Sequence, residues 1–243
     1  MVERLDPQHI IPRATDIQQV LARQGNLQDA RQYQRFFKTG PGEYGEGDRF
    51  RGIRVPVLRH LTRTYAALPL DQTERLLASP YHEDRMLALL IMVRQYQRGD
   101  RTTQNRLYRS YVNHLARINN WDLVDCSAPY LPGPHLATRD RAILDRWAAS
   151  PHLWTRRIAI MATFHFIRLG QFDDTLRLAA RLLGDPEDLM HKATGWMLRE
   201  VGNRDRETLR TFLDHHLPTM PRTMLRYAIE KLPPNERRAY LTR

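Results

Sequence analysis

Residues 85–93 read RMLALLIMV, an apolar run that decides the fold class of the chain. A helix that is hydrophobic around its whole circumference must be buried by neighbouring elements on every side. Similar apolar helices are predicted through residues 158–162 and 191–201, each preceded by a turn that contains proline. No convincing run alternates between apolar and polar residues, the pattern typical of strands. The sequence therefore predicts an all-α fold.

The apolar helices recur at a nearly constant interval. Stepping by about 35 residues from the first of them leads each time to a predicted helix. The positions in this common phase are Arg49, Arg85, Trp121, Arg157, Lys192 and Arg226. A period of this size with two helices per unit is typical of α-solenoids, and signatures of TPR and ankyrin repeats are absent. We therefore expect a single domain over residues 1–243, an α-solenoid of HEAT-like helical repeats whose shared phase lines a concave basic groove.

The charge of the chain points to a polyanionic partner. Lysine and arginine total 38 against 27 acidic residues, which gives a net charge of +11 and a pI near 10.3. The lysines are Lys38, Lys192 and Lys231, so arginine supplies nearly all of the positive charge. The guanidinium group is a planar fork of donors suited to phosphate, so this composition favours nucleic acid. Codon bias in a GC-rich genome would explain the ratio of arginine to lysine but not the net excess.

Several other classes of protein are disfavoured. No apolar run approaches the ~20 residues of a membrane span. The first residues, MVERLDPQHIIPR, contain no apolar stretch of signal-peptide length. The single Cys126 cannot form an intramolecular disulfide, and the histidines lack the spacing of metal ligands. We therefore expect a cytoplasmic, nucleoid-associated protein with no membrane span and no metal cluster built from Cys or His.

Glycine is densest in residues 40–48, which read GPGEYGEGD. The segment lacks the Gly-Lys-Ser/Thr ending of a P-loop, and no strand is predicted before it. Its acidic residues also argue against a grip on phosphate. We expect a structured loop that joins the first helices.

Trp121 and Asp125 form the first candidate catalytic pair. A spacing of four residues places both side chains on one face of a helix. Breaking an N-glycosidic bond builds positive charge on the sugar, which a carboxylate stabilises electrostatically and an aromatic face stabilises by cation–π attraction. The carboxylate could also orient the attacking water. A core tryptophan beside an exposed or N-capping aspartate is the structural alternative.

Cations and a further aromatic residue accompany this pair. Arg156 and Arg157 begin another helix as a phosphate clamp or a solvated pair, and the period places Arg157, rather than Arg156, in phase with Trp121. Trp196 follows Gly195, whose lack of a side chain permits the close approach of a neighbouring helix or of a ligand backbone. Candidate DNA-binding residues are Arg85, Arg156, Arg157 and Lys192.

Together these motifs resemble the AlkD family of bacterial DNA alkylation repair glycosylases. The resemblance rests on residues 121–125 (WDLVD), 154–159 (WTRRIA) and 192–200 (KATGWMLRE), and on an N-terminal signature between residues 36 and 59. It covers roughly residues 30–235. All four motifs in this order are more specific than any one of them.

The resemblance implies a HEAT-like solenoid that hydrolyses the N-glycosidic bond of cationic N3- and N7-alkylated purines in duplex DNA. The family works without metal or cofactor, and it engages the sugar and phosphates of the lesion without flipping the base. By motif match, Asp125 is the catalytic carboxylate, Trp121 and Trp196 surround the lesion, and Arg157 contacts the DNA backbone. The resemblance also implies a monomer with no obligate protein partner.

Two departures from the family pattern leave the activity open. Phe36 stands where the family has a tyrosine facing the active site, and the glycine-rich segment is longer than in the simplest members. A non-catalytic binder of damaged or branched DNA is therefore the alternative function, and an ordinary HEAT scaffold is a third. Retention of both tryptophans, Asp125 and Arg157 favours the enzyme.

Overall fold

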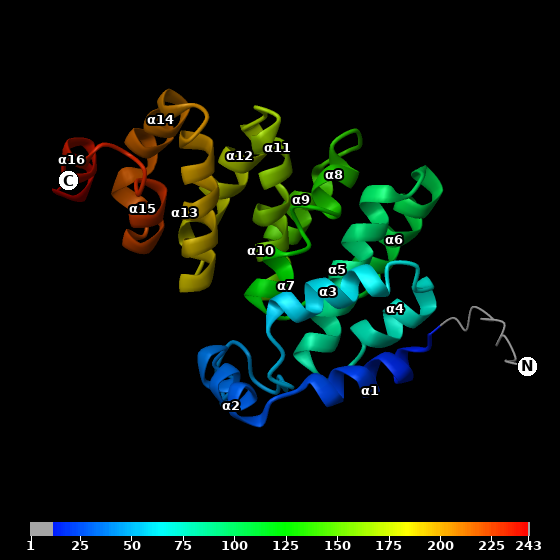
Figure 1. The fold of residues 1–243 in the computed structure, drawn as a ribbon. Coiled ribbons are helices and arrows are strands. Elements are labelled where there is room, and N and C mark those ends of the chain that lie inside the picture. The colour runs from blue at the N-terminus through cyan, green and yellow to red at the C-terminus, as the bar shows by residue number, and fades with distance from the viewer. Residues whose placement is uncertain (1–11, 243) are drawn as a thin grey trace, which may run out of the picture. The chain divides into compact units, whose positions relative to one another are not determined.

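The structure, a computed structural model, describes residues 12–242, and within that range the chain is helical (Figure 1). Among the described residues there is no β-strand, and Arg49 and Tyr81 form an isolated β-bridge. The all-α prediction is confirmed. In this range no helix is both long and apolar enough to span a bilayer. The prediction that the chain has no leader peptide rests largely on residues 1–11, which lie outside the described residues.

Contacts divide the chain after Ser110 into two compact units, called unit 1 and unit 2 below. The expectation of one domain over residues 1–243 stays a prediction. Unit 1 contains α1 (Ala14–Gln24), α2 (Leu27–Phe36), α3 (Val55–Thr64), α4 (Leu70–Leu77) and α5 (His82–Arg98), and α6 (Arg101–Asn113) spans the division. Unit 2 contains η1 (Leu115–Arg117), α7 (Trp121–Asp125), α8 (Pro132–Leu136), α9 (Ala142–Ala148), α10 (Leu153–Ala162), α11 (Phe164–Arg168), α12 (Asp173–Arg181), η2 (Leu182–Gly184), α13 (Asp188–Gly202), α14 (Arg206–His216), η3 (Leu217–Thr219), α15 (Arg222–Ala228) and α16 (Pro234–Thr242).

The core of unit 1 is built around α5, which contains the apolar run 85–93. Leu87, Leu89, Ile91 and Met92 have no exposed surface. They lie on several faces of the helix, and α3 and α4 both pack against it (Figure 1). The sequence-based expectation of a helix buried all round is confirmed.

The glycine-rich segment is part of the loop between α2 and α3 and is held by hydrogen bonds of its own. Gly42 and Gly47 have φ angles of 74° and 78°, a region that residues with a Cβ rarely adopt. The carboxylates of Glu43 and Glu46 accept hydrogen bonds from the backbone N–H groups of Gly40 and Gly42, both at 2.9 Å. The acidic residues thus fold the loop onto itself, which agrees with the prediction of a structured loop.

Unit 2 repeats a pairing of helices. Helices α7, α10, α13 and α15 pack in succession, each against the next. A second set packs behind them, with α9 against α10, α14 against α13, and α12 against both α10 and α13. The phase residues Trp121, Arg157, Lys192 and Arg226 all lie on the first set. This arrangement matches the repeated two-helix unit predicted from the period.

Candidate functional site

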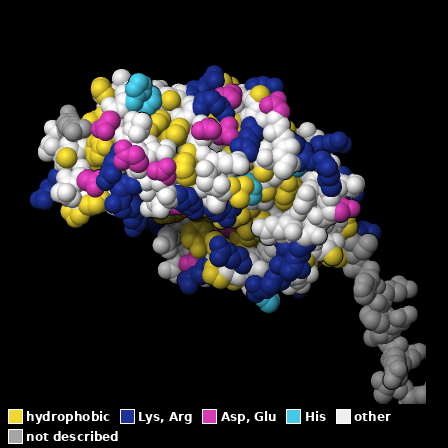
Figure 2. All heavy atoms as spheres, turned by 90° about the horizontal axis from the view of Figure 1, so that it is seen from above, with side chains coloured by type: hydrophobic (Ala, Val, Ile, Leu, Met, Phe, Trp, Pro, Cys, Tyr) yellow, Lys and Arg dark blue, Asp and Glu magenta, His cyan; other side chains and the backbone are white. Residues whose placement is uncertain are grey.

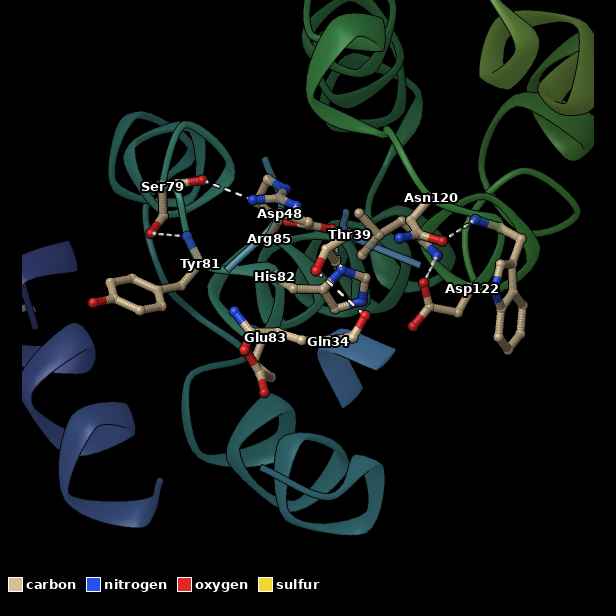
Figure 3. Close-up of polar contacts among 12 residues, drawn as sticks. Gln34, Thr39, Asp48, Ser79, Tyr81, His82, Glu83, Arg85, Asn120 and Asp122 are labelled. Carbon is tan, nitrogen blue, oxygen red and sulfur yellow. Dashed lines mark hydrogen bonds and ion pairs between the residues drawn. The ribbon is translucent and has the colours of Figure 1, made fainter. Parts of the chain in front are cut away.

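The site begins on α7, a short helix with a well-defined start. The side chain of the fully buried Asn120 accepts a hydrogen bond from the backbone N–H of Trp121 at 2.9 Å. Asp122 lies in the first turn, where a negative charge is favoured by the helix dipole (Figure 3). Leu123 and Val124 are completely buried and fix the orientation of the helix. Trp121 at its first position and Asp125 at its last are left partly exposed.

Asp125 is joined to Arg157 of α10 by a bidentate ion pair. Nε of Arg157 donates to Oδ1 at 2.9 Å, and Nη2 donates to Oδ2 at 2.8 Å. Nη1 of the same guanidinium donates to the backbone carbonyl of Leu189, at the start of α13, at 2.7 Å. One arginine therefore ties α7, α10 and α13 together. The exposed fractions are 6% for the Arg157 side chain and 16% for that of Asp125, so the carboxylate is reachable but mostly desolvated.

The environment of Asp125 perturbs its protonation. Burial raises the pKa of the Asp125 carboxyl above its ordinary value, and the charge and hydrogen bonds of Arg157 oppose this rise. The nearby charge of Asp122 raises the pKa a little further. Perturbed carboxyl groups of this kind are frequent at functional sites and also occur in structural ion pairs.

The two tryptophans flank different parts of this region. Trp121 is half-buried and shares α7 with Asp125. Trp196 is half-buried on α13, about two helical turns beyond Leu189. Its Nε1 donates to Glu200 at 3.3 Å, and its ring centroid lies 6.4 Å from that of Phe164. Among the described residues, no hydrogen bond or ring contact joins Trp196 to Asp125. The structure thus unites Asp125 with Arg157 and places Trp196 along the neighbouring helix.

Arg156 and Lys192 have acidic partners nearby. Arg156 forms a bidentate pair with Asp185 at 2.6 and 3.1 Å and donates to the carbonyls of Ser150 and Pro151. Its side chain is 12% exposed, so this guanidinium fastens the turn before α13. Lys192 pairs with Asp188 at 2.8 Å, and its side chain is 41% exposed. Of these two candidates, Lys192 is the one whose charge is open to solvent.

Arg85 differs most from its expected position. It lies inside unit 1 with 3% of its surface exposed. Its guanidinium donates to Asp48 and, at 3.0 Å, to the carbonyl of Ser79, while His82 contacts the same Asp48 at 2.9 Å (Figure 3). The prediction that Arg85 lies on a helix is correct, but its side chain points to the loop before α3. In this conformation Arg85 is an internal ion-pair partner rather than a surface contact for phosphate.

Basic side chains are abundant on the visible surface. Figure 2 shows a face on which lysine and arginine outnumber acidic side chains, with hydrophobic atoms between them. A surface of this kind suits a polyanion.

Comparison with known proteins identifies the family. The family model described as DNA alkylation repair enzyme matches residues 17–232. This chain belongs to that family. Among solved structures, a predicted DNA alkylation repair enzyme from Enterococcus faecalis has the same fold, with a TM-score of 0.67 and 17% sequence identity over 87% of this chain and 98% of that one. No curated protein matches the chain significantly.

In this member of the DNA alkylation repair family, sequence reasoning missed the acidic partners of Arg156 and Arg157. The Asp125–Arg157 and Arg156–Asp185 pairs join residues 32 and 29 positions apart, which is close to one repeat. A search at the predicted period of about 35 residues would not have found them, because both separations are shorter than that period. Phe36, the departure from the family pattern, ends α2 in unit 1 and is 62% exposed.

Proposed function

We propose that this DNA alkylation repair family member is a monofunctional DNA glycosylase that hydrolyses the N-glycosidic bond of cationic N3- and N7-alkylated purines in duplex DNA. The observation that supports this most strongly is Asp125, a mostly desolvated carboxylate fixed by Arg157 on the helix that also carries Trp121. The substrate class comes from the resemblance to the AlkD family.

The proposed reaction needs little from the protein besides electrostatics. The C1′–N bond breaks, and its electron pair leaves with the cationic purine, which becomes neutral. The sugar passes through an oxocarbenium-like state, and the oxygen of a water molecule then bonds to C1′ while its proton is released. A carboxylate in a low-dielectric site stabilises the developing positive charge more strongly than one in water. Asp125 in its ionised form supplies this charge and can orient the water.

Trp121 and Trp196 are proposed to flank the lesion. An indole face attracts a cation within about 6 Å of its centre, so both the alkylated base and the developing sugar cation are suitable partners. Each tryptophan is half-buried, so part of its surface is accessible to such a ligand.

Arg157 is proposed to position the catalytic carboxylate. Its ion pair holds the Asp125 carboxylate in one orientation, which makes Arg157 a positioning residue. The contact with the DNA backbone that the family motif implies stays a prediction, because this guanidinium is 6% exposed and already donates to Asp125 and to the carbonyl of Leu189. Lys192, whose side chain is 41% exposed and pairs with Asp188, is a proposed contact for phosphate.

Base release separates this function from its rivals. Duplex DNA treated with a methylating agent should lose 3-methyladenine and 7-methylguanine in the presence of the protein, and untreated duplex should release nothing above background. Binding of both duplexes should be measured in parallel. Binding without release would favour the non-catalytic binder, and absence of binding at physiological salt would favour the scaffold.

A further inference from the structure

A second cluster of cationic and aromatic side chains lies on unit 2, beyond Trp196. Arg168 ends α11, and the Cζ atom of its exposed side chain lies 5.0 Å from the ring centroid of Phe164 and 5.3 Å from that of Tyr130. Both distances are within the range of cation–π attraction. The guanidinium is therefore restrained by two rings, that of Phe164 on α11 and that of Tyr130 just before α8.

A second guanidinium shares one of these rings. The Cζ atom of Arg204 lies 5.9 Å from the ring centroid of Phe164. Arg204 also pairs with Glu200 at 3.1 Å, and Glu200 accepts the hydrogen bond from Trp196. Contacts thus run continuously from Trp196, through Phe164, to the two arginines.

The charges in this cluster are not balanced. Within residues 12–242, no carboxylate forms an ion pair with Arg168, and Glu200 is paired with Arg204. On the same helix, burial, together with the charges of Arg168 and Arg141, lowers the pKa of His165, which indicates a positive local potential. Arg141 itself is paired with Asp174. Arg168 thus carries a positive charge that no carboxylate among the described residues compensates, and an anion bound to it would supply that compensation.

An arginine restrained beside aromatic rings is well suited to phosphate. The contacts with Phe164 and Tyr130 restrain the Arg168 guanidinium, and its side chain remains exposed to solvent. Because the side chain is already restrained, forming a hydrogen-bonded fork with a phosphate costs less rotamer entropy than for a mobile side chain.

From these observations we propose that Arg168, with Arg204 beside it, is a binding site for the phosphodiester backbone of the DNA substrate. The surface that runs from Trp196 through Phe164 contacts the part of the duplex that extends beyond the lesion. This rests on the proposed function in assuming that the ligand is DNA. It adds contacts outside the motifs that indicated the catalytic residues.

Salt dependence of binding to undamaged duplex DNA tests this site without requiring catalysis. Arg168→Gln keeps much of the stem but removes the charge, and it should lower the slope of log K against log salt by about 1 because one fewer counterion is released. Affinity at low salt should fall by roughly 3- to 10-fold, the range expected from that slope. The matched control is Arg146→Gln on α9, an exposed arginine for which no ion pair is found among the described residues. It should leave slope and affinity unchanged.

Two further measurements keep the result interpretable. Phe164→Leu retains both charges but loses the shared ring, and its affinity should fall while the slope stays close to that of the wild type. Far-UV circular dichroism and thermal unfolding confirm that each variant is folded. A slope for Arg168→Gln equal to that of the wild type and of Arg146→Gln would overturn the proposal and would favour an acidic protein surface as the partner. If the wild type binds DNA but releases no base, the glycosylase assignment fails. The phosphate site is then still tested by the salt slope of DNA binding for Arg168→Gln.

Discussion

At the scale of single residues, the ion pair with Arg157 both weakens the negative potential of the Asp125 carboxylate and fixes its orientation. An arginine bonded to both carboxylate oxygens weakens the negative potential that a substrate meets, yet it fixes the direction from which that potential acts. In a site that must meet a developing cation, fixed direction is worth more than a mobile full charge, because no reorganisation is needed during the reaction.

Replacement of Arg157 tests whether it positions Asp125. Arg157→Lys keeps the positive charge but cannot reproduce the fork that grips both oxygens. If Arg157 positions Asp125, single-turnover base release should fall by up to about 100-fold, the order expected for a misplaced catalytic group. The salt slope of DNA binding should stay near that of the wild type. Base release at the wild-type rate would contradict the positioning role.

The raised pKa of Asp125 predicts a pH dependence. The proposed mechanism needs the ionised carboxylate, and a raised pKa means that this form is lost at a higher pH than for an ordinary aspartate, whose pKa is about 3.9. Release of 7-methylguanine, whose charge is fixed, should therefore decline on the acidic side well before pH falls to about 4. The rate is measured in single turnovers after subtraction of uncatalysed depurination. A rate that stays flat down to that pH would contradict the ionised-carboxylate role.

At the scale of elements, Gly195 shows why α13 and α15 approach so closely. A Cβ added at this position would lie 2.5 Å from the carbonyl oxygen of Met224 and 2.6 Å from Cβ of Tyr227. The close approach anticipated from the sequence therefore involves a neighbouring helix. Both obstructing atoms belong to α15 and cannot swing aside like the end of a long side chain.

Gly195→Ala should consequently destabilise the protein by about 1–3 kcal/mol, the cost typical of overpacking. Denaturant unfolding measures this change. Gly184→Ala is the matched control, because no atom lies within 4 Å of its added Cβ, and its effect should remain within about 0.5 kcal/mol. Equal stabilities for the two variants would show that the helices separate at little cost.

The helices themselves could largely be predicted from the sequence, whereas the ion pairs between them could not. Apolar periodicity located α5, α10 and α13, because burial of a hydrophobic helix is written into its own residues. The partner of an arginine is decided by the neighbouring repeat. Arg51–Asp84 and Arg141–Asp174 are both separated by 33 positions, so they follow the repeat rather than any local motif.

At the scale of the whole molecule, two properties extend over nearly the entire sequence: the net charge of +11 and the family match over residues 17–232. Phase along the repeats placed Trp121 and Arg157 on α7 and α10, which pack against each other, but it did not predict the ion pair between Asp125 and Arg157. Phase alone could not predict that Arg85 forms an ion pair with Asp48 and that Arg156 forms one with Asp185. A period fixes the direction of a side chain from its helix but not the acidic residue that it meets there.

The central claim is that the ionised Asp125 carries out the chemistry, and one comparison tests it directly. Single-turnover release of methylated purines from duplex DNA should be measured for the wild type, Asp125→Asn and the control Asp122→Asn, with DNA binding measured alongside. We predict that Asp125→Asn lowers the rate by about 100-fold or more, comparable to losing a main electrostatic stabiliser, while binding persists and Asp122→Asn remains active. Release by Asp125→Asn at the wild-type rate would contradict the account.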